Sequence, residues 1–469
     1  MNKRFNFIAS IAAVVAILLT ACGGAVTTSA PAATSAPAAT SAPAATSAPA
    51  ASSVEELKIL WAQWDPADYL QQVGNLYEQE TGIKVTIVQE PWGSFGSLFN
   101  TEMAAKGTSW DMVVGDSQWL GQNATTGNYV DLTDFMTSNG LDKTVTPATL
   151  KYYGEYPANS GKYYAYPTEG DADGWAYRKD LFENPDEMAA FKAKYGYDLA
   201  VPETYAQLMD IAEFFTREDQ GLYGVGIYTQ IDYDAMTMGV ENTLFAWGAT
   251  WQDANNNVKG VVNSPQAVEA LQAYKDLYDC CQVPGLSNAF FTETNDAMIG
   301  GKAVMIMNYF AFFPALVNPG TNPNYADKVG FFPNPAGPSG DRGAALGGQG
   351  MSIISHVSAE RQQAARDFIL WFAQDSIQEK WAELGGYTCN AKVLASDKFL
   401  ATTPFNPAFA ETMTFVKDFW NIPEFEQLLT VTQTEFSKFI VEGQGTAQGA
   451  LDTIAEAHDK ILRENGYIK

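Results

Sequence analysis

The sequence predicts an α/β protein that contains more than one domain. Its 469 residues are more than a single hydrophobic core usually organises. From residue 57 onward, apolar strand-like segments alternate with segments of helical periodicity, a pattern typical of α/β folds. Residues 23–55 are a low-complexity stretch that cannot form a core, so we expect the folded part to begin near Val54.

Residues 1–22 have the features of a lipoprotein signal peptide. Lys3 and Arg4 precede an apolar run over residues 8–19, which is too short to span a membrane comfortably. The run ends in Leu19-Thr20-Ala21-Cys22, which resembles a bacterial lipobox, where the cysteine is lipidated and becomes the mature N-terminus. An ordinary secretory signal with an incidental cysteine is the alternative, but spacing and position favour lipidation of Cys22.

The linker over residues 23–55 is rich in Ala, Pro, Ser and Thr. The unit Thr-Ser-Ala-Pro-Ala-Ala repeats between Thr28 and Ala51, and its regular prolines favour an extended, semi-rigid chain. It predicts a stalk that holds the folded part away from a membrane. We therefore expect an extracytoplasmic protein that is lipid-anchored to the outer face of the cell membrane, or periplasmic.

The composition excludes some classes of partner. Asp and Glu number 54 against 28 Lys and Arg, a net charge of −26. Nucleic acids and anionic membrane surfaces both require a basic face, so neither is expected as a partner, and membrane contact is expected only through the lipid anchor. Aromatic residues make up 13% of the chain. They can be buried in cores, but exposed aromatics also suit a site for a partly apolar, hydroxylated ligand.

The first part of the folded chain alternates strand and helix. Asp65-Pro66 supplies a helix N-cap and a proline at the first helical position, and Thr81-Gly82 stops that helix. The expected elements are a strand at 57–61, a helix from 65 to about 81, a strand at 83–88, a helix at about 95–106 and a strand at 110–114.

This β-α-β-α-β order implies a parallel sheet whose ligand crevice lies at the carboxyl ends of the strands. The residues just past those ends are Trp64, Asp65, Trp92 and Asp116. Each could alone be a helix cap or a core residue. Chance alone would not be expected to place all of them at the crevice, so they are candidate ligand contacts.

Residues 161–182 place carboxylates between two strand-like segments. Residues 163–166 are expected to be extended because they are aromatic and precede Pro167. An acidic, glycine-bearing break over 169–174 follows, and then a second strand at 175–177. One interpretation is a chain crossing between two lobes that exposes carboxylates at the crossing. The other is an acidic hairpin loop, and these residues alone favour neither.

The rest of the chain is expected to be helical with short strands. Ser264-Pro265 caps one helix, and Gly300-Gly301-Lys302 introduces a buried strand. The expected helices cover 202–215, 264–278, 359–372 and 377–384, and the expected strands cover 222–228, 303–307 and 351–354. The chain beyond them is expected to be mostly helical to residue 461. The stretch 183–200 is rich in charge and aromatics, and its purpose is not evident.

Four short segments follow one another in a recognisable order. They are Thr81-Gly82-Ile83-Lys84-Val85, Gly301-Lys302-Ala303-Val304-Met305, the Pro-Ala-Gly-Pro segment at 335–338, and Gly347-Gly348 with the strand and helix that follow. Together they resemble extracellular solute-binding protein family 1, the carbohydrate-binding subunits of bacterial ABC importers, to which maltose-binding protein is related. The resemblance covers the whole chain after the stalk, although no single segment is specific.

The resemblance implies a two-lobed, periplasmic-binding-protein-like α/β fold with discontinuous lobes joined by crossing hinge segments. On the family pattern the crossings fall near Thr168, Ala303 and Gly350. The N-terminal lobe would comprise residues 56–167 and 304–349, and the C-terminal lobe residues 168–303 and 350–469. It also implies a monomer without cofactor that captures a mono- or oligosaccharide between its lobes and delivers it to ABC transporter permease subunits.

Sugar chemistry explains the residue types at the candidate site. Pyranose C–H faces stack on Trp or Tyr, and hydroxyls donate to carboxylates. On the family pattern Asp116 and Glu169 are the carboxylates at the third strand and at the first crossing, and Asn308 and Tyr309 follow a strand that often carries an aromatic wall. The other candidates, each of which could instead be a cap or core residue, are Trp64, Asp65, Trp92, Tyr233, Trp247, Gly348 and Tyr387.

The sequence gives only weak support for a catalytic function. The two histidines, His356 and His458, lie in no metal or hydrolase motif, and the Asp-rich segment 253–257 lacks the glycine and distal glutamate of a calcium loop, so it is interpreted as a hairpin turn. A secreted glycoside hydrolase that pairs Asp116 with Glu169 is the alternative function. We expect a binding protein and not an enzyme, with no metal site.

Lipidation of Cys22 leaves Cys280, Cys281 and Cys389, an odd count for an exported protein. A bond between the adjacent pair would need strain, because consecutive Cα atoms are only ~3.8 Å apart. We therefore expect one of the two, Cys281 in preference, to bond Cys389 and pin the loop that carries it. Three buried thiols are the alternative.

Overall fold

The computed structural model describes residues 54–231 and 233–468. The chain divides into two compact units, residues 1–51 and 52–469, and the description below concerns the second. The predicted signal peptide, the lipidation of Cys22 and almost all of the linker lie outside the described residues. Within the described ranges, none of the helices combines the length and the apolar character needed to cross a membrane.

The predicted β-α-β-α-β unit is confirmed. Strand β1 (Glu56–Ala62) pairs in parallel with β2 (Lys84–Glu90) and with β3 (Met112–Asp116). Helix α1 (Asp65–Thr81) joins β1 to β2, and α2 (Trp92–Ala104) joins β2 to β3. Gly82 ends α1 with a φ of 78°, a left-handed conformation that glycine adopts without the steric cost a side chain brings. Helix α2 begins three residues before the expected start.

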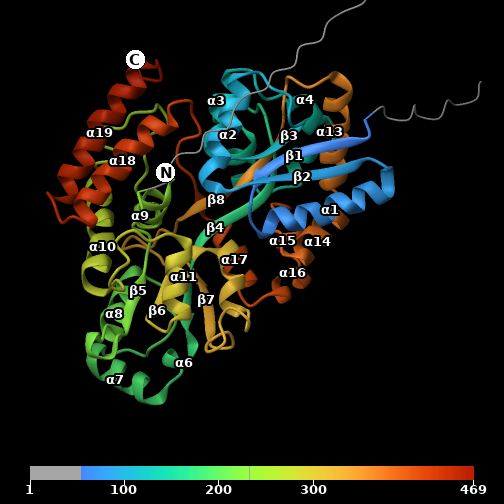
Figure 1. The fold of residues 1–469 in the computed structure, drawn as a ribbon. Helices are drawn as coiled ribbons and strands as arrows, with labels where there is room; N and C mark the ends of the chain where they lie inside the picture. The colour runs from blue at the N-terminus through green and yellow to red at the C-terminus, as the bar shows by residue number, and fades with distance from the viewer. Residues whose placement is uncertain (1–53, 232, 469) are drawn as a thin grey trace, which may run out of the picture. The chain divides into compact units, whose positions relative to one another are not determined.

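The strands form one mixed sheet in the order β2-β1-β3-β8-β4-β6-β5, with β7 beside β4 and β9 beside β8. The parallel β1–β3 group lies at one end, and β8 runs antiparallel to β3 (Figure 1). The remaining strands are β4 (Tyr166–Arg178), β5 (Tyr223–Gly226), β6 (Ala303–Tyr309), β7 (Val329–Pro333), β8 (Ala344–Ile353) and β9 (Val416–Lys417).

Strand β4 corrects the expected acidic break. It is one continuous strand of 13 residues, so neither the break nor the acidic hairpin exists. Residues 166–172 pair with β8, and residues 173–178 pair with β6 and β7. The strand continues because its carboxyl groups are buried rather than solvated, and because Gly174 leaves room for the ring of Phe310, which a side chain would overlap.

Two clusters of buried apolar side chains flank this strand. The first surrounds β1–β3, and the second surrounds α9 (Ala235–Ala246), α10 (Pro265–Cys281), α18 (Phe425–Ile440) and α19 (Ala447–Glu464). Helices α13 to α17 were expected in the C-terminal lobe, yet they pack in the first cluster, where α13 contacts β1 and α14 contacts α1. The division into two movable lobes with the predicted ranges stays a prediction.

Helices account for most of the remaining chain, as expected, and the expected helix at 359–372 is confirmed. The turn at residues 253–257 is closed by Asp253, which accepts from the backbone N–H groups of Asn255 and Asn257. The helices after α2 are α3 (Leu120–Thr125), α4 (Thr133–Ser138), α5 (Pro147–Thr149), α6 (Lys179–Phe182), α7 (Pro185–Tyr195), α8 (Tyr205–Phe215), α9 (Ala235–Ala246), α10 (Pro265–Cys281), α11 (Phe291–Ile299), α12 (Pro314–Val317), α13 (Ala359–Phe372), α14 (Asp375–Leu384), α15 (Ala391–Leu394), α16 (Asp397–Thr402), α17 (Asn406–Thr412), α18 (Phe425–Ile440) and α19 (Ala447–Glu464).

Candidate ligand-binding site

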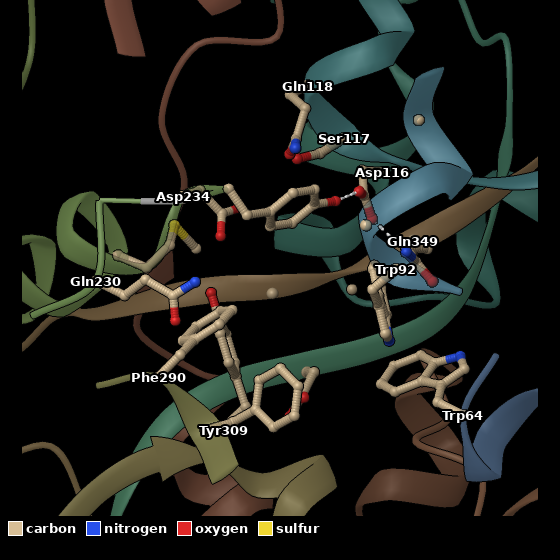
Figure 2. A pocket seen from close by; sticks show the side chains of 18 of the residues that line it. Trp64, Trp92, Asp116, Ser117, Gln118, Gln230, Asp234, Phe290, Tyr309 and Gln349 are labelled. Atoms are coloured by element: carbon tan, nitrogen blue, oxygen red, sulfur yellow. Dashed lines mark hydrogen bonds between the residues drawn. The ribbon is translucent and has the colours of Figure 1, made fainter. Parts of the chain in front are cut away.

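A cavity of about 630 Å³ lies where β3, β4, β6 and β8 meet the N-terminal ends of α2, α9 and α11 (Figure 2). Its size is within the range of pockets that bind small molecules. The structure brings six of the predicted site residues together in its lining: Trp64, Trp92, Asp116, Tyr233, Tyr309 and Gly348.

The parallel strands explain why the first three of these residues meet. Trp64 follows β1, Trp92 follows β2, and Asp116 ends β3. Because the carboxyl ends of parallel strands share one edge of a sheet, these three residues share one wall of the cavity. Three of the four residues that were predicted to lie at a common crevice therefore meet there, and their contact with a ligand stays a prediction.

The tryptophans form an aromatic wall. The ring centroids of Trp64 and Trp92 are 5.3 Å apart in an edge-to-face arrangement, and Trp92 meets Tyr233 in the same way at 5.8 Å. The indole N–H groups of Trp64 and Trp92 are buried and have no hydrogen-bond partner among residues 54–231 and 233–468. A buried donor without a partner costs free energy, so each can gain by donating to a polar ligand.

Asp116 is held in place by two donors. Its carboxylate accepts hydrogen bonds from the Tyr233 hydroxyl and from the Gln349 side-chain amide, and Trp61 in turn donates to Gln349. Figure 2 shows Gln349 and Asp116 side by side at the cavity wall. Burial raises the pKa of Asp116 to about 7, and the Gln349 bond opposes that rise only in part.

Strand β4 contributes a second carboxyl group. Asp171 lines the cavity and accepts from the backbone N–H groups of Ala172 at 2.8 Å and Ala311 at 3.3 Å. Glu169 and Asp173 follow the two-residue period of the strand but are fully buried outside the lining. Burial raises the pKa of Asp171 and Glu169 well above their usual range.

The structure does not place five predicted site residues in this cavity. Asn308 precedes the lining residue Tyr309 on β6, so the alternation of the strand points it away, where it accepts from the Tyr228 hydroxyl and donates to Asn295. Glu169 lies on the same face of β4 as Asp171 but is fully buried outside the lining, and neither of its carboxylate oxygens has a hydrogen-bond partner among the described residues.

The other three lie farther from the lining. Trp247 packs edge-on against Tyr205, with ring centroids 5.0 Å apart, in the second cluster. Tyr387 donates its hydroxyl to the carbonyl oxygen of Phe310 at 2.7 Å. It borders a separate cavity of about 220 Å³ together with Asp65, which is exposed at the start of α1.

Sequence reasoning missed several residues that line the cavity. Asp171 could have been found from the strand period, because it lies two residues after Glu169 on an unbroken strand. Gln349 adjoins the predicted Gly348 but carries no motif. The remaining missed residues include Gln230, Asp234, Phe290, Phe291, Glu293 and Glu426, for which the sequence holds no local signal.

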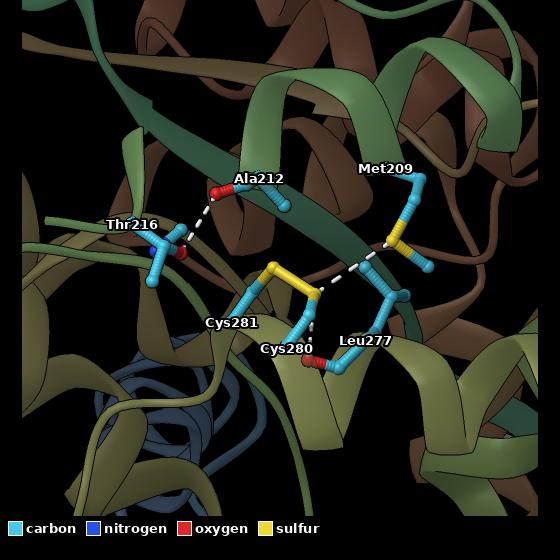
Figure 3. The surroundings of a disulfide bond; sticks show 7 residues. Met209, Ala212, Thr216, Leu277, Cys280 and Cys281 are labelled. Atoms are coloured by element: carbon cyan, nitrogen blue, oxygen red, sulfur yellow. Dashed lines mark hydrogen bonds between the residues drawn. A yellow bond between two sulfur atoms is a disulfide. The ribbon is translucent and has the colours of Figure 1, made fainter. Parts of the chain in front are cut away.

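The predicted disulfide between Cys281 and Cys389 is wrong. Cys281 bonds its neighbour Cys280 at the end of α10 (Figure 3). Cys389 is a buried free cysteine. The two predicted partners belong to different clusters, since Cys281 packs in the second and Cys389 in the first. Backbone hydrogen bonds, rather than sulfur, hold the loop that carries Cys389: Gly170 donates to the carbonyl of Tyr387 at 2.6 Å.

Comparison with known proteins gives one consistent result. The family described as bacterial extracellular solute-binding protein matches residues 72–408. A probable ABC transporter-binding protein of Deinococcus radiodurans is 24% identical over 350 residues, which is 72% of this chain and 76% of that protein.

Two solved structures have the same fold. An ABC transporter solute-binding protein of Agrobacterium radiobacter in complex with ribitol superimposes with a TM-score of 0.73 at 24% identity, over 88% of this chain and 99% of that one. The maltose-bound MalE3 protein of T. maritima gives a TM-score of 0.74 at 24% identity, over 87% and 100%. The predicted α/β fold class is confirmed, and because the family match spans well over half of the sequence, the chain belongs to the family of bacterial extracellular solute-binding proteins.

Proposed function

We propose that this protein captures a carbohydrate or an alditol in the cavity and delivers it to the permease of an ABC importer. The observation that carries the proposal is the pairing, in one cavity, of an aromatic wall with the fixed carboxylate of Asp116. Aromatic faces stack on the C–H faces of a sugar, and carboxylates accept from its hydroxyls. The ribitol and maltose bound by the two structural relatives belong to this class of ligand.

The geometry gives little support to the alternative, a glycoside hydrolase. That reaction needs two carboxyl groups that flank the scissile bond. Of the pair proposed from the sequence, only Asp116 lines the cavity, while Glu169 is fully buried outside it. We therefore infer a binding protein without catalytic activity, and we expect no release of the aryl group when the protein is incubated with aryl glycosides.

A thermal-shift screen against alditols, monosaccharides and oligosaccharides tests the proposed function. A ligand that binds only the folded state raises the apparent stability, by about 2.7 kcal/mol at a hundred times its Kd. Calorimetry with the best ligand then compares two variants. Asp116→Ala is expected to weaken binding by about 1.5–3 kcal/mol, because it removes a charge-assisted hydrogen bond. Glu55→Gln, at an exposed residue outside the cavity, is the control.

Two results would contradict the proposal. One is a screen in which no carbohydrate or alditol raises the melting temperature. The other is a carbohydrate that binds the Asp116→Ala variant as tightly as the wild type, which would place its site elsewhere in the protein.

The lipid anchor and the monomeric state remain proposals as well. If Cys22 is lipidated, a Cys22→Ala variant expressed in its own host should appear in the medium or soluble fraction, while the wild type stays with the membrane. Wild-type protein that is released in the same proportion would exclude the anchor.

A further inference from the structure

The cavity carries an excess of carboxyl groups. Five line it, from five different elements, and the described part of the lining holds no Lys, Arg or His. In the described chain none of the five makes an ion pair. They are Asp116 at the end of β3, Asp171 on β4, Asp234 before α9, Glu293 on α11 and Glu426 on α18.

Three of these carboxyl groups belong to residues that are almost inaccessible to solvent. The exposed fractions are 9% for Asp116, 3% for Asp171 and 7% for Asp234. Figure 2 shows Asp116 and Asp234 on opposite sides of the cavity, so carboxyl groups face the space from two directions. Buried carboxylates are normally paired with a cation, because desolvation without a partner is costly. Here the part of the chain that the structure describes supplies none.

Two further carboxyl groups lie behind the lining. Glu169 and Asp173 are fully buried on the same face of β4 as Asp171, and neither forms an ion pair in the described residues. Burial raises the pKa of Glu169, Asp171 and Asp173, so a cation in the cavity would favour their ionised form, and the low-dielectric aromatic walls would screen that attraction less than water does.

The aromatic residues suit a cation for a second reason. Trp64 and Trp92 lie on one side of the cavity, and Phe290 and Tyr309 lie beside it on the other (Figure 2). The faces of aromatic rings attract cations, and tryptophan does so most strongly. A protonated amine in this space would meet ring faces and carboxylates together.

We propose that the preferred ligand is a carbohydrate or alditol that carries a protonated amine, such as an amino sugar. This inference rests on the proposed function, and it names the chemical class within it. The hydroxyl groups of the ligand would be bound as in any sugar site, while its ammonium group would supply the counter-charge that the cavity lacks. Sugar acids and sugar phosphates would be rejected by like charge.

Matched ligands that differ only in charge test the proposal. One series is D-glucitol, D-glucamine and D-gluconate; a second is cellobiose, its 2,2′-diamino analogue (the chitosan dimer) and cellobiouronic acid. Each is titrated into the whole protein by calorimetry at neutral pH, at low and at high salt. In at least one series we expect the amine to bind roughly tenfold or more tighter than the neutral compound, and the acid to show no binding. The preference for the amine should shrink as salt is added.

Variants then assign the preference to the carboxyl groups. Asp116→Asn keeps the shape of the side chain and should reduce the ratio of amine to neutral affinity severalfold. Glu426→Gln, at an exposed rim position where folding is not at stake, should reduce it in the same direction. Glu55→Gln, outside the cavity, should leave the ratio unchanged.

The outcomes separate the two proposals. A neutral compound that binds as tightly as its amine, or an acid that binds at all, would overturn the amine inference and leave the carbohydrate function standing. An amine preference that survives both cavity variants would also overturn it, because the preference would then have another source. A lack of binding by every member of both series would overturn it and would count against carbohydrate binding itself if the thermal-shift screen were also negative.

Discussion

Replacing Asp418 by Asn should remove a pH dependence of stability that the wild type has. Asp418 is 9% exposed and directly follows β9, where it accepts a hydrogen bond from the backbone N–H of Phe419 at 2.8 Å. Burial raises its pKa from the ordinary 3.8 to about 7, and repulsion from Asp116 adds to the rise. The folded protein therefore binds this proton more tightly than the unfolded chain does.

The sign and size of the effect follow from that difference. A carboxyl group with a raised pKa in the folded state favours folding at low pH, and this contribution is lost as pH rises through about 7. Between about pH 8.5 and about pH 5.5, linkage gives the wild type a gain of about 2 kcal/mol from Asp418 alone. Asn cannot titrate but still accepts the Phe419 bond, so the Asp418→Asn variant should lack this gain.

Urea unfolding at the two pH values, followed by tryptophan fluorescence, measures the free energy of unfolding of both proteins. His458 works in the opposite direction, since burial lowers its pKa to about 4 and stability from it is lost as pH falls below about 6.5. That loss is common to both proteins and cancels in their difference. Exposed Glu55→Gln serves as the control. Stability curves for wild type and Asp418→Asn that run parallel from pH 8.5 to 5.5 would refute the reasoning.

Three further predictions concern packing, sulfur and motion. A Cβ on Gly121 would overlap the carbonyl oxygen of Asn421, so Gly121→Ala should lower the free energy of unfolding by about 1–3 kcal/mol. Gly93 faces open space, so Gly93→Ala should leave the free energy of unfolding unchanged. Equal free energies of unfolding for the two variants would contradict the packing shown by the structure. Mass spectrometry of a non-reduced digest should find Cys280–Cys281 oxidised within one peptide and Cys389 alkylated only after unfolding; a peptide that links Cys389 to either would restore the rejected pairing. Small-angle scattering should give a smaller radius of gyration with saturating ligand if two lobes close, and unchanged curves would argue for a rigid protein.

The sequence was most informative where function follows directly from chain order. Alternation of strand and helix after residue 57 predicted a parallel unit, and the carboxyl ends of its strands predicted the positions of Trp64, Trp92 and Asp116. That inference needed only the geometry of parallel sheets, which no distant part of the chain alters.

It was least informative where neighbours decide which way a side chain points. Asn308 and Tyr309 are adjacent and both polar, and only the pairing of β6 with β4 settles which faces the cavity. The acidic residues of β4 looked solvated because carboxylates usually are, and their burial depends on β8, more than 160 residues farther along the chain. The prediction of the disulfide failed for the same reason, since the clusters that separate Cys281 from Cys389 form only by long-range packing.

The continuity of β4 has a mechanical consequence. Its first half is hydrogen-bonded to β8 and its second half to β6 and β7, so the same backbone ladder joins both buried clusters. A connection of this kind resists a free swivel and deforms instead by twisting, over several residues, as sheets do. An opening of the proposed lobes would therefore twist β4 and store elastic strain in it. Asp171 lies on this strand, so a ligand that binds Asp171 would hold the strand in one twisted conformation, and release of the ligand would allow the strand to relax.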